Sequence, residues 1–378
     1  MQDSLFEIRM PLVNGSRVKQ ARELRGFTQA SLADELYIDQ TMIAHIERGR
    51  KQPTADLLEI LAQLLDFPTS FFRQADCLEM PKGSLLFRSK AIVGKKVIAQ
   101  AHEYSRLSLE LALRLSAHAK LIPIRVPSCD DPIEAAQELR KTLDLPDGPI
   151  DGVIRCIERL GVLVIPIPEI RDCDAFATWA GPDRGIPVIG LSGGRPADRI
   201  RLSAAHELGH LILHRSIHSA TKLNEEEAYT FASEFVMPAA DIYSDLVEQK
   251  ISLFRLAELK SKWRVSMQAI LRRSRELQII NDRQYRYVMM QISHRGWRSE
   301  QPEFNSVIER PRALRKISEV AFGYSDTWER LAKEFNLSAI FVTSVLGACE
   351  PPQGQPTQIA KHRSGDKSTN IISFVKQA

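Results

Sequence analysis

Apolar residues recur at three- and four-residue steps in the first part of the chain, in runs separated by turn residues. Four such runs lie between residues 12 and 72, and they read GSRVKQARELRG, FTQASLADELYI, DQTMIAHIERGRKQP and TADLLEILAQLLDF. Thr28, Asp39 and Thr54 stand where their side chains can cap the second, third and fourth helices. The pattern predicts a compact, all-helical domain over residues 12–75.

The helical period stops after residue 75. Pro81 and Gly83 break the stretch 76–96, which also contains the short strand-like run SLLF. A long amphipathic pattern then covers residues 97–120. We therefore assign residues 76–129 to a linker followed by one long helix.

The middle of the chain alternates between helical and strand patterns. Two helical runs, PIEAAQELRKTLDL and IDGVIRCIERLG, precede three short runs typical of strands, VLVIPIPEI, DAFATWA and IPVIGLS. A small mixed sheet is expected. Helices at about 196–215 and 224–236 follow, and Pro238 ends the second. These elements predict an α+β domain over residues 130–245.

Beyond residue 245 the pattern is helical again, so residues 246–349 are expected to form a helical C-terminal domain. Residues 350–378 are polar and rich in Pro and Gly, and they are expected to form a flexible tail. The fold class is therefore α+β and mostly helical, with an all-α unit at the N-terminus.

Three segments share a loose pattern: LADELYIDQTMI from residue 32, LAELKSKWRVSMQAIL from residue 256 and LAKEFNLSAIFV from residue 331. Each begins with Leu-Ala on a helix, passes a turn, and resumes with Asp or Ser at a helix start. Any pair of helices joined by a short turn can give this pattern, so for the second and third segments it is not specific.

The composition sets limits on the function. The 378 residues are 44% hydrophobic and 26% charged, as in a globular protein of two or three domains. A net charge of +4 is small, so any nucleic-acid partner has to be argued from local patches. Five cysteines without a C-x-x-C pair argue against a disulfide framework and favour a reducing cytosol. We expect a cytoplasmic protein with no membrane partner, because the sequence has no export signal and no long apolar stretch.

The run AAHELGHLILH, residues 204–214, carries an H-E-x-x-H motif. On a helix His206 and His210 share one face, so both imidazoles can bind one Zn²⁺. Glu207 lies beside the metal, where it can take a proton from the water that zinc activates and pass it to the leaving amine. Chance produces this motif in about one chain in a hundred of this length, so its place on an apolar helix after three strands adds weight.

The third ligand has to come from another segment. His214 lies eight residues after His206, about 12 Å along a helix axis, which is too far for both to bind one ion. The following run, NEEEAYTFASEFVMP, offers Glu225, Glu226 and Glu227. At about 100° per residue the apolar face of this helix is centred nearest Glu225, and Glu226 lies almost opposite. We therefore expect Glu225 to be the ligand.

The runs RIRLSAAHELGHLILH and EEEAYTFASEFVMP together resemble the ImmA/IrrE family of zinc metallopeptidases. The resemblance implies zinc ligands at His206, His210 and Glu225, in agreement with the helical-face argument. The family often has Asn or Asp where this chain has Tyr229, whose hydroxyl can orient His206 as a weaker partner than a carboxylate. We place Tyr229 and His214 behind the ligands, in contact with them rather than with the metal.

Residues 17–72 resemble the Cro/repressor (XRE-type) helix-turn-helix family through RELRGFTQASLADEL and TMIAHIERGRKQP. The resemblance implies that the helix from about residue 40 to residue 48 enters the major groove of double-stranded DNA. Base contacts are then expected from Gln40, Thr41, Ala44 and His45, and phosphate contacts from Gln29 and Arg48.

A helical bundle that binds another protein is the alternative for this unit. Residues 1–75 contain nine Lys and Arg against ten Asp and Glu, so the unit is not basic overall. Basic residues nevertheless gather on two of its helices, at Arg17, Lys19, Arg22 and Arg25 and at Arg48, Arg50 and Lys51. Residues 251–300 contain eleven Lys and Arg against four Asp and Glu, which fits a solvated face as well as a second nucleic-acid surface.

These observations leave three hypotheses. The first is a DNA-binding regulator with a zinc metallo-endopeptidase domain, which cleaves a regulatory protein in a stress or mobile-element response. The second is a transcription regulator whose zinc domain is a sensor or scaffold, and the third is an antitoxin-like partner protein. The intact Glu207 favours the first, and the fused DNA-binding unit favours the second. A homodimer is a further possible assembly, because repressor units of this type usually act as dimers.

Overall fold

The computed structural model describes residues 12–76, 78–81, 94–116, 118, 123–169, 174–181, 185–215, 221–298, 301, 308–323 and 328–349. The N-terminal unit contains α1 (Gly15–Leu24), α2 (Gln29–Glu35), α3 (Gln40–Glu47), α4 (Ala55–Leu65) and a 3-10 turn, η1 (Phe71–Arg73). Thr28 and Thr54 cap α2 and α4 by accepting backbone N–H groups of Ser31 and Leu57. This unit is all-helical, as the apolar spacing predicts.

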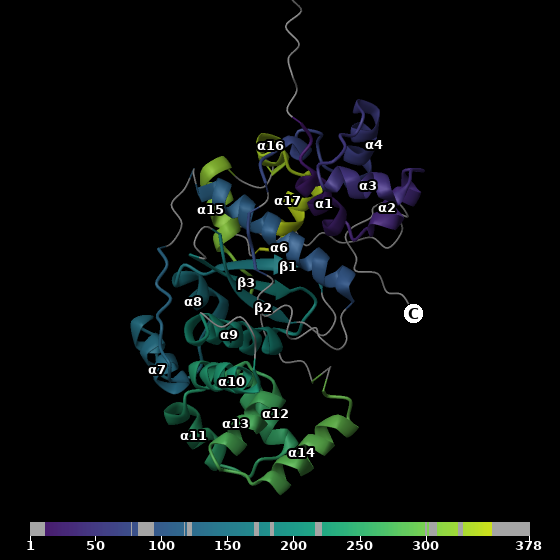
Figure 1. The fold of residues 1–378 in the computed structure, drawn as a ribbon. Coiled ribbons are helices and arrows are strands. Elements are labelled where there is room, and N and C mark those ends of the chain that lie inside the picture. The colour runs from purple at the N-terminus through teal and green to yellow at the C-terminus, as the bar shows by residue number, and fades with distance from the viewer. Residues whose placement is uncertain are drawn as a thin grey trace, which may run out of the picture.

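The three-stranded sheet lies in the middle of the molecule (Figure 1). It follows α6 (Lys95–Ser116), α7 (Pro132–Thr142) and α8 (Val153–Arg159), and its strands are β1 (Leu163–Ile167), β2 (Ala175–Ala180) and β3 (Ile186–Ser192). The strand order is β1-β3-β2, with β3 parallel to β1 and antiparallel to β2. The expectation of a small mixed sheet is confirmed. The run SLLF and the tail 350–378 lie outside the described residues.

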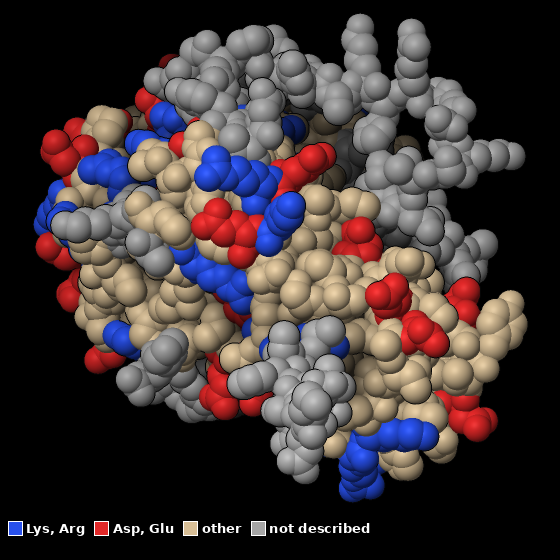
Figure 2. Space-filling view, turned by 90° about the horizontal axis from the view of Figure 1, so that it is seen from above, with Lys and Arg blue, Asp and Glu red and all other residues tan. Residues whose placement is uncertain are grey.

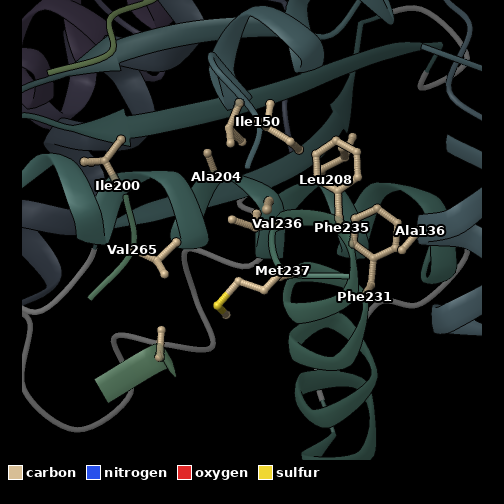
Figure 3. Packing of buried hydrophobic residues seen from close by; sticks show 14 of the residues in the cluster. Ala136, Ile150, Ile200, Ala204, Leu208, Phe231, Phe235, Val236, Met237 and Val265 are labelled. Atoms are coloured by element: carbon tan, nitrogen blue, oxygen red, sulfur yellow. The ribbon is translucent and has the colours of Figure 1, made fainter. Parts of the chain in front are cut away.

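Two helices after the sheet carry the candidate metal ligands, and a helical group follows them. These elements are α9 (Ala197–Leu213), α10 (Lys222–Val236), α11 (Ala239–Val247), α12 (Leu253–Trp263), α13 (Met267–Glu276) and α14 (Asp282–His294). Their apolar faces share one buried cluster with α7, α8 and one side of the sheet. Figure 3 shows Leu208 of α9 beside Phe231 and Phe235 of α10, and Val265 near Ile200.

The last three helices, α15 (Ala313–Phe322), α16 (Trp328–Glu334) and α17 (Ala339–Gly347), belong to a different cluster. Their buried residues pack with α1, α4, α6 and β1, at the end of the molecule opposite α12–α14 (Figure 1). The described helices of residues 246–349 are therefore divided between two hydrophobic clusters, which differs from the expectation of one C-terminal helical domain. An apolar stripe shows that a helix is buried on one side but does not identify what covers it.

A buried ion pair joins the N-terminal unit to α6. Arg17 Nη1 lies 2.7 Å from Glu110 Oε2, and the two side chains are 3% and 4% exposed. Arg17 also donates to the Gln20 side chain and to the carbonyl of Ala75, while Glu110 accepts the backbone N–H of Leu78. Charges that are buried this deeply persist only when paired and hydrogen-bonded, as these are.

The three segments with the loose repeat form the same turn. Tyr37, Arg264 and Asn336 have φ values of 54°, 56° and 53°, and each stands two residues before the N-cap of the next helix. Three other non-glycine residues that follow helices in the described part of the chain also have a positive φ, so the likeness lies in the two-residue spacing to an Asp or Ser N-cap. Within the described part of the chain, the pairs α2–α3, α12–α13 and α16–α17 therefore share one helix-turn-helix arrangement.

None of the described helices combines the length and the apolar character needed to cross a membrane.

Candidate metal centre and nucleic-acid interface

Helix α9 presents two histidines on the face opposite its apolar stripe. The stripe, which includes Ala204, Leu208 and Ile212, is buried in the cluster that contains the sheet residues Ala177 and Ile189. His206 and His210 point instead toward α10, and their ring centroids are 4.8 Å apart. A spacing of four residues puts both imidazoles on the same face of α9, one turn apart.

Glu225 of α10 completes a group of three ligand atoms. His206 Nε2 and His210 Nε2 are 3.1 Å apart, and each lies 3.3 Å from one Glu225 carboxylate oxygen. Bonds of about 2.0–2.1 Å to a tetrahedral ion would separate ligand atoms by about 3.3–3.4 Å. The donor set and its spacing therefore fit one divalent metal ion, and among the described residues no other group of three has this arrangement.

The electrostatics of the group also suit a cation. Hydrogen bonds from His206 and His210 hold the pKa of the Glu225 carboxyl well below its ordinary value, so that carboxylate is ionised at neutral pH. Of the neighbouring carboxylates, Glu226 is 3.6 Å from Lys222 at the surface and Glu227 turns to His214. The structure thus separates the three consecutive glutamates, with Glu225 beside both histidines.

His214 lies behind His210 and is itself held by Glu227. His214 Nδ1 is 3.0 Å from His210 Nδ1, and His214 Nε2 is 2.8 Å from Glu227 Oε2. Burial lowers the pKa of His214, which favours its neutral form. A carboxylate only accepts, so the His214 proton lies on Nε2 and its Nδ1 accepts from His210 Nδ1. A metal at His210 Nε2 would replace the proton that this atom shares with Glu225 in the metal-free group, and His210 Nδ1 would still donate to His214.

Sequence reasoning placed His214 behind the ligands but did not assign a role to Glu227. The signal was available, since His210 and His214 are four residues apart on one helix face and a carboxylate commonly fixes the ring orientation of a ligand histidine. What the sequence could not give is the distance between α9 and α10. Gly209 sets it, because a Cβ there would lie 3.1 Å from the carbonyl oxygen of Ala228.

Tyr229 is a neighbour of His206, with ring centroids 6.4 Å apart and an edge-on arrangement. The guanidinium of Arg272 lies over the Tyr229 ring, 3.2 Å from its centroid. Burial raises the pKa of Tyr229 to about 12, so the phenol stays protonated at neutral pH. The ring therefore forms a wall between His206 and α13.

A cavity of about 560 Å³ opens beside the ligand group. Its walls come from α9, α10 and α13, and the residues that line it are Leu202, Ser203, His206, Lys222, Glu225, Glu226, Tyr229, Arg272 and Arg275. Glu207 is 0% exposed and does not line this cavity. A peptide segment could reach two of the three ligand residues from this side.

In the N-terminal unit, helix α3 has an exposed face. Gln40, Thr41, His45 and Arg48 are exposed, and Ala44 is half-buried. Gln29 is half-buried as well, and its amide donates to Glu47 Oε2 at 2.7 Å, next to the Arg22–Glu47 ion pair. The bonded Glu47 fixes α1, α2 and α3 relative to one another.

The basic residues of α1 do not form a surface patch. Arg17 and Arg22 are buried and paired with Glu110 and Glu47, and Arg25 is bonded to Asp66. Figure 2 shows lysine and arginine side chains interspersed with aspartate and glutamate on the face seen from above. A phosphate contact from α1 is therefore not supported by these arginines, whereas Arg48, Arg50 and Lys51 are exposed after α3.

The other two helix-turn-helix motifs present different second helices. In α13 the residues Met267, Ile270 and Leu271 are buried, and Arg273 is 4% exposed. The outer face of α17 is partly open, but residues 339–347 contain no Lys, Arg, Asn or Gln that could reach a base or a phosphate. Exposure and chemistry together single out α3.

Comparisons with known proteins identify the two domains that contain these residues. Residues 157–275 match the family model of the IrrE N-terminal-like domain, and residues 18–72 match that of the helix-turn-helix family. The HTH-type transcriptional regulator YazB of Bacillus subtilis (strain 168) is 35% identical over 52 residues, which cover 14% of this chain and 75% of that relative. Both resemblances drawn from the sequence are confirmed. The chain therefore belongs to the helix-turn-helix family of transcriptional regulators and carries, over residues 157–275, a domain of the IrrE N-terminal-like peptidase family.

Proposed function

We propose that this transcriptional regulator binds zinc in its IrrE-like domain and uses it to hydrolyse a peptide bond in a regulatory protein. The proposal is carried by the geometry of the ligand group. His206 and His210 lie on one face of α9, and the ionised carboxylate of Glu225, from α10, lies 3.3 Å from each of them. Glu207 directly follows the ligand His206 in the sequence. Two imidazoles and a carboxylate are a donor set of catalytic zinc sites, which keep a further position open.

The residues divide the chemistry among them. His206, His210 and Glu225 would hold the ion, which when bound would supply a Lewis acid and lower the pKa of a water molecule. Glu207 would accept the proton of the attacking water and return it to the leaving amine, as a general base and then a general acid. Glu227 and His214 would keep the His210 ring in the orientation and tautomer that binding requires.

The test is the substitution Glu207→Gln. Zinc content by elemental analysis should stay at about one per chain, because Glu207 is not a proposed ligand, while cleavage should fall by several orders of magnitude for want of a base. Proteomics of cells that carry the wild type or the variant would show which proteins lose their cleavage products. Glu329→Gln, an exposed site on α16, is the matched control. Cleavage that survives Glu207→Gln at full rate would refute the proposed mechanism.

A zinc sensor is the second candidate, and the burial of Glu207 favours it. A general base has to reach water, whereas Glu207 is 0% exposed. A sensor requires only metal occupancy, so Glu207→Gln would regulate its promoter normally while His206→Ala would fail. Normal regulation by the zinc-loaded Glu207→Gln protein would therefore favour the sensor over the peptidase.

We further propose that α3 reads the base edges of double-stranded DNA. Its exposed Gln40 and Thr41 carry donors and acceptors that suit the major groove, and Arg48 at its end suits a phosphate. Gln40→Ala with Thr41→Ala should abolish sequence preference and leave weak, salt-sensitive binding, whereas Arg48→Ala should weaken binding to all sequences alike. A genome-wide pull-down without any preferred site would contradict this proposal.

A further inference from the structure

We propose that the cavity beside the ligand group is a subsite for a carboxylate of the peptide substrate, bound by Arg272 and Arg275 of α13. The proposal rests on the proposed peptidase function and adds a substrate class to it. The two guanidinium groups share the cavity with His206 and Glu225, so a bound carboxylate would lie next to the metal ligands.

The cavity is large enough to take more than a water molecule. Its volume of about 560 Å³ falls in the range of sites that bind small ligands. Three cations line it, namely Lys222, Arg272 and Arg275, against one acidic residue apart from the metal ligand Glu225, namely Glu226. Lys222 and Glu226 are both exposed and lie 3.6 Å apart, which leaves the two partly exposed arginines as the remaining positive charge of the cavity wall.

Each arginine has a carboxylate neighbour that leaves donors available. Arg272 Nε lies 3.0 Å from Glu276 Oε1, and the Arg272 side chain is 34% exposed. Arg275 lies 3.8 Å from Asp282, which is 77% exposed, and its guanidinium lies over the Tyr285 ring. Arg272 uses one of its five donors for Glu276, which is 25% exposed, and the pair of Arg275 with exposed Asp282 contributes little. A substrate carboxylate can therefore be added at the first arginine or exchanged at the second.

The position of α13 is fixed relative to the metal ligands. Buried Arg273 forms an ion pair with Glu234 of α10 and donates to the carbonyl oxygen of Met237. Arg272 is held over the ring of Tyr229, one turn after Glu225 on the same helix. The second helix of this helix-turn-helix motif therefore faces the cavity rather than a DNA groove, and it carries its arginines to the cavity wall.

A carboxylate is the ligand that this wall suits best. The planar guanidinium fork matches a carboxylate in a bidentate arrangement, and two such groups can bracket one anion. In a peptide that carboxylate is either an Asp or Glu side chain close to the scissile bond or the C-terminus of the chain. Both sources share the chemistry, and the experiment separates them.

The test measures binding rather than turnover, with the zinc-loaded Glu207→Gln protein. Three pools of fluorescein-labelled random octapeptides are titrated by anisotropy: one with Glu fixed at a central position and an amidated end, one with Gln there and an amidated end, and one with Gln there and a free C-terminus. We expect a carboxylate-containing pool to bind about tenfold tighter than the amidated Gln pool. Preference for the Glu pool identifies a side chain, and preference for the free end identifies a C-terminus.

The arginines are tested on the same background. Arg275→Gln, at a side chain that is 41% exposed, should retain fold and zinc and lose most of the preference, and adding Arg272→Gln should remove the rest. Arg275→Lys should keep part of it, because the charge stays while the fork is lost. Arg283→Gln, an exposed residue of α14 that does not line the cavity, is the control and should change nothing.

Two outcomes overturn the subsite: equal binding of all three pools, or a preference that survives the double substitution with zinc still bound. Either result leaves the peptidase proposal standing if the wild type cleaves proteins in a Glu207-dependent manner. A carboxylate preference that the arginines control, in a protein that cleaves nothing, would instead support the subsite and refute the peptidase. The two proposals therefore fail separately.

Discussion

Replacing Gly209 by alanine should weaken metal binding without unfolding the protein. Gly209 lies one residue before His210, where α9 faces the backbone of α10. An added Cβ would lie 3.0 Å from Phe231 Cδ1, 3.1 Å from the carbonyl oxygen of Ala228 and 3.2 Å from its Cα. Phe231 is completely buried and Ala228 presents its backbone, so neither neighbour can turn aside. The helices have to separate by a few tenths of an ångström.

That shift should change the stability of the fold only slightly and lower the metal affinity strongly. Glu225 lies one turn before Ala228 on α10, so it moves away from both histidines together with the helix. Metal sites tolerate deviations of about 0.2 Å in ligand distances, so a loss of tenfold or more in affinity is expected, as for other disturbances of ligand geometry. In stability, alanine gains about 1 kcal/mol as a helix former and overpacking costs about 1–3 kcal/mol, which gives a net loss of about 0–2 kcal/mol.

The assay is a zinc titration against a chromogenic chelator, together with urea unfolding of the metal-free protein. Gly347→Ala on α17 is the control, because a Cβ there would meet Trp328 at an ordinary 3.7 Å. The control should keep full zinc affinity and gain up to about 1 kcal/mol. If Gly209→Ala binds zinc as tightly as the wild type and gains stability like the control, the spacing of α9 and α10 does not limit the site.

Three further predictions concern the Glu227–His214–His210 contacts, the buried Arg17–Glu110 ion pair and the stability at alkaline pH. Glu227→Ala should reduce zinc affinity about 10- to 100-fold because His214 would no longer hold the His210 ring in place, whereas Glu226→Ala should not. Equal affinities of the two variants in a chelator titration would contradict this role of Glu227. Glu110→Ala should lower the free energy of unfolding, measured in urea, by about 3–5 kcal/mol because Arg17 stays buried without its carboxylate. The double substitution Arg17→Met with Glu110→Leu should restore most of that stability. Burial raises the pKa of Cys349 to about 12, so the folded state binds more protons than the unfolded state above pH 9, and stability should fall by up to about 1.4 kcal/mol per pH unit. Urea unfolding of Cys349→Ala at pH 8 and 10, under reducing conditions, should show a smaller fall.

Local patterns predicted the elements of this fold because each depends on neighbours in sequence. The runs DAFATWA and IPVIGLS correspond to β2 and β3, which are buried along almost their whole length, since short apolar runs that end at Gly and Pro are typical of buried strands. The long helix was expected at 97–120, and the structure gives α6 from Lys95 to Ser116. Helix ends depend on caps and turns, and these lie within a few residues of the pattern itself.

Long-range placement could not be predicted in the same way. The apolar stripes of α12–α14 and of α15–α17 are equally regular, yet one group packs beside α10 and the other beside α1 and α6. The stripe on α10 favoured Glu225 over its two neighbours, but the contact of Glu227 with His214 and the approach of Arg272 to Tyr229 depend on how α9, α10 and α13 meet. The burial of Arg17 and Arg22 also depends on long-range packing. It makes two of the basic residues of the N-terminal unit inaccessible to DNA.

The three helix-turn-helix motifs show why a repeated motif does not carry one function. Their turns share a left-handed residue two positions before an Asp or Ser N-cap, so the local sequence fixes the same bend each time. What differs is the partner of the second helix. Helix α3 keeps Gln40 and Arg48 in solvent, α17 carries no Lys, Arg, Asn or Gln, and α13 is held on α10 through buried Arg273. Because recognition requires an exposed face with donors and acceptors, the first motif is suited to DNA, whereas the second helix of the second motif lines the cavity beside the ligand group.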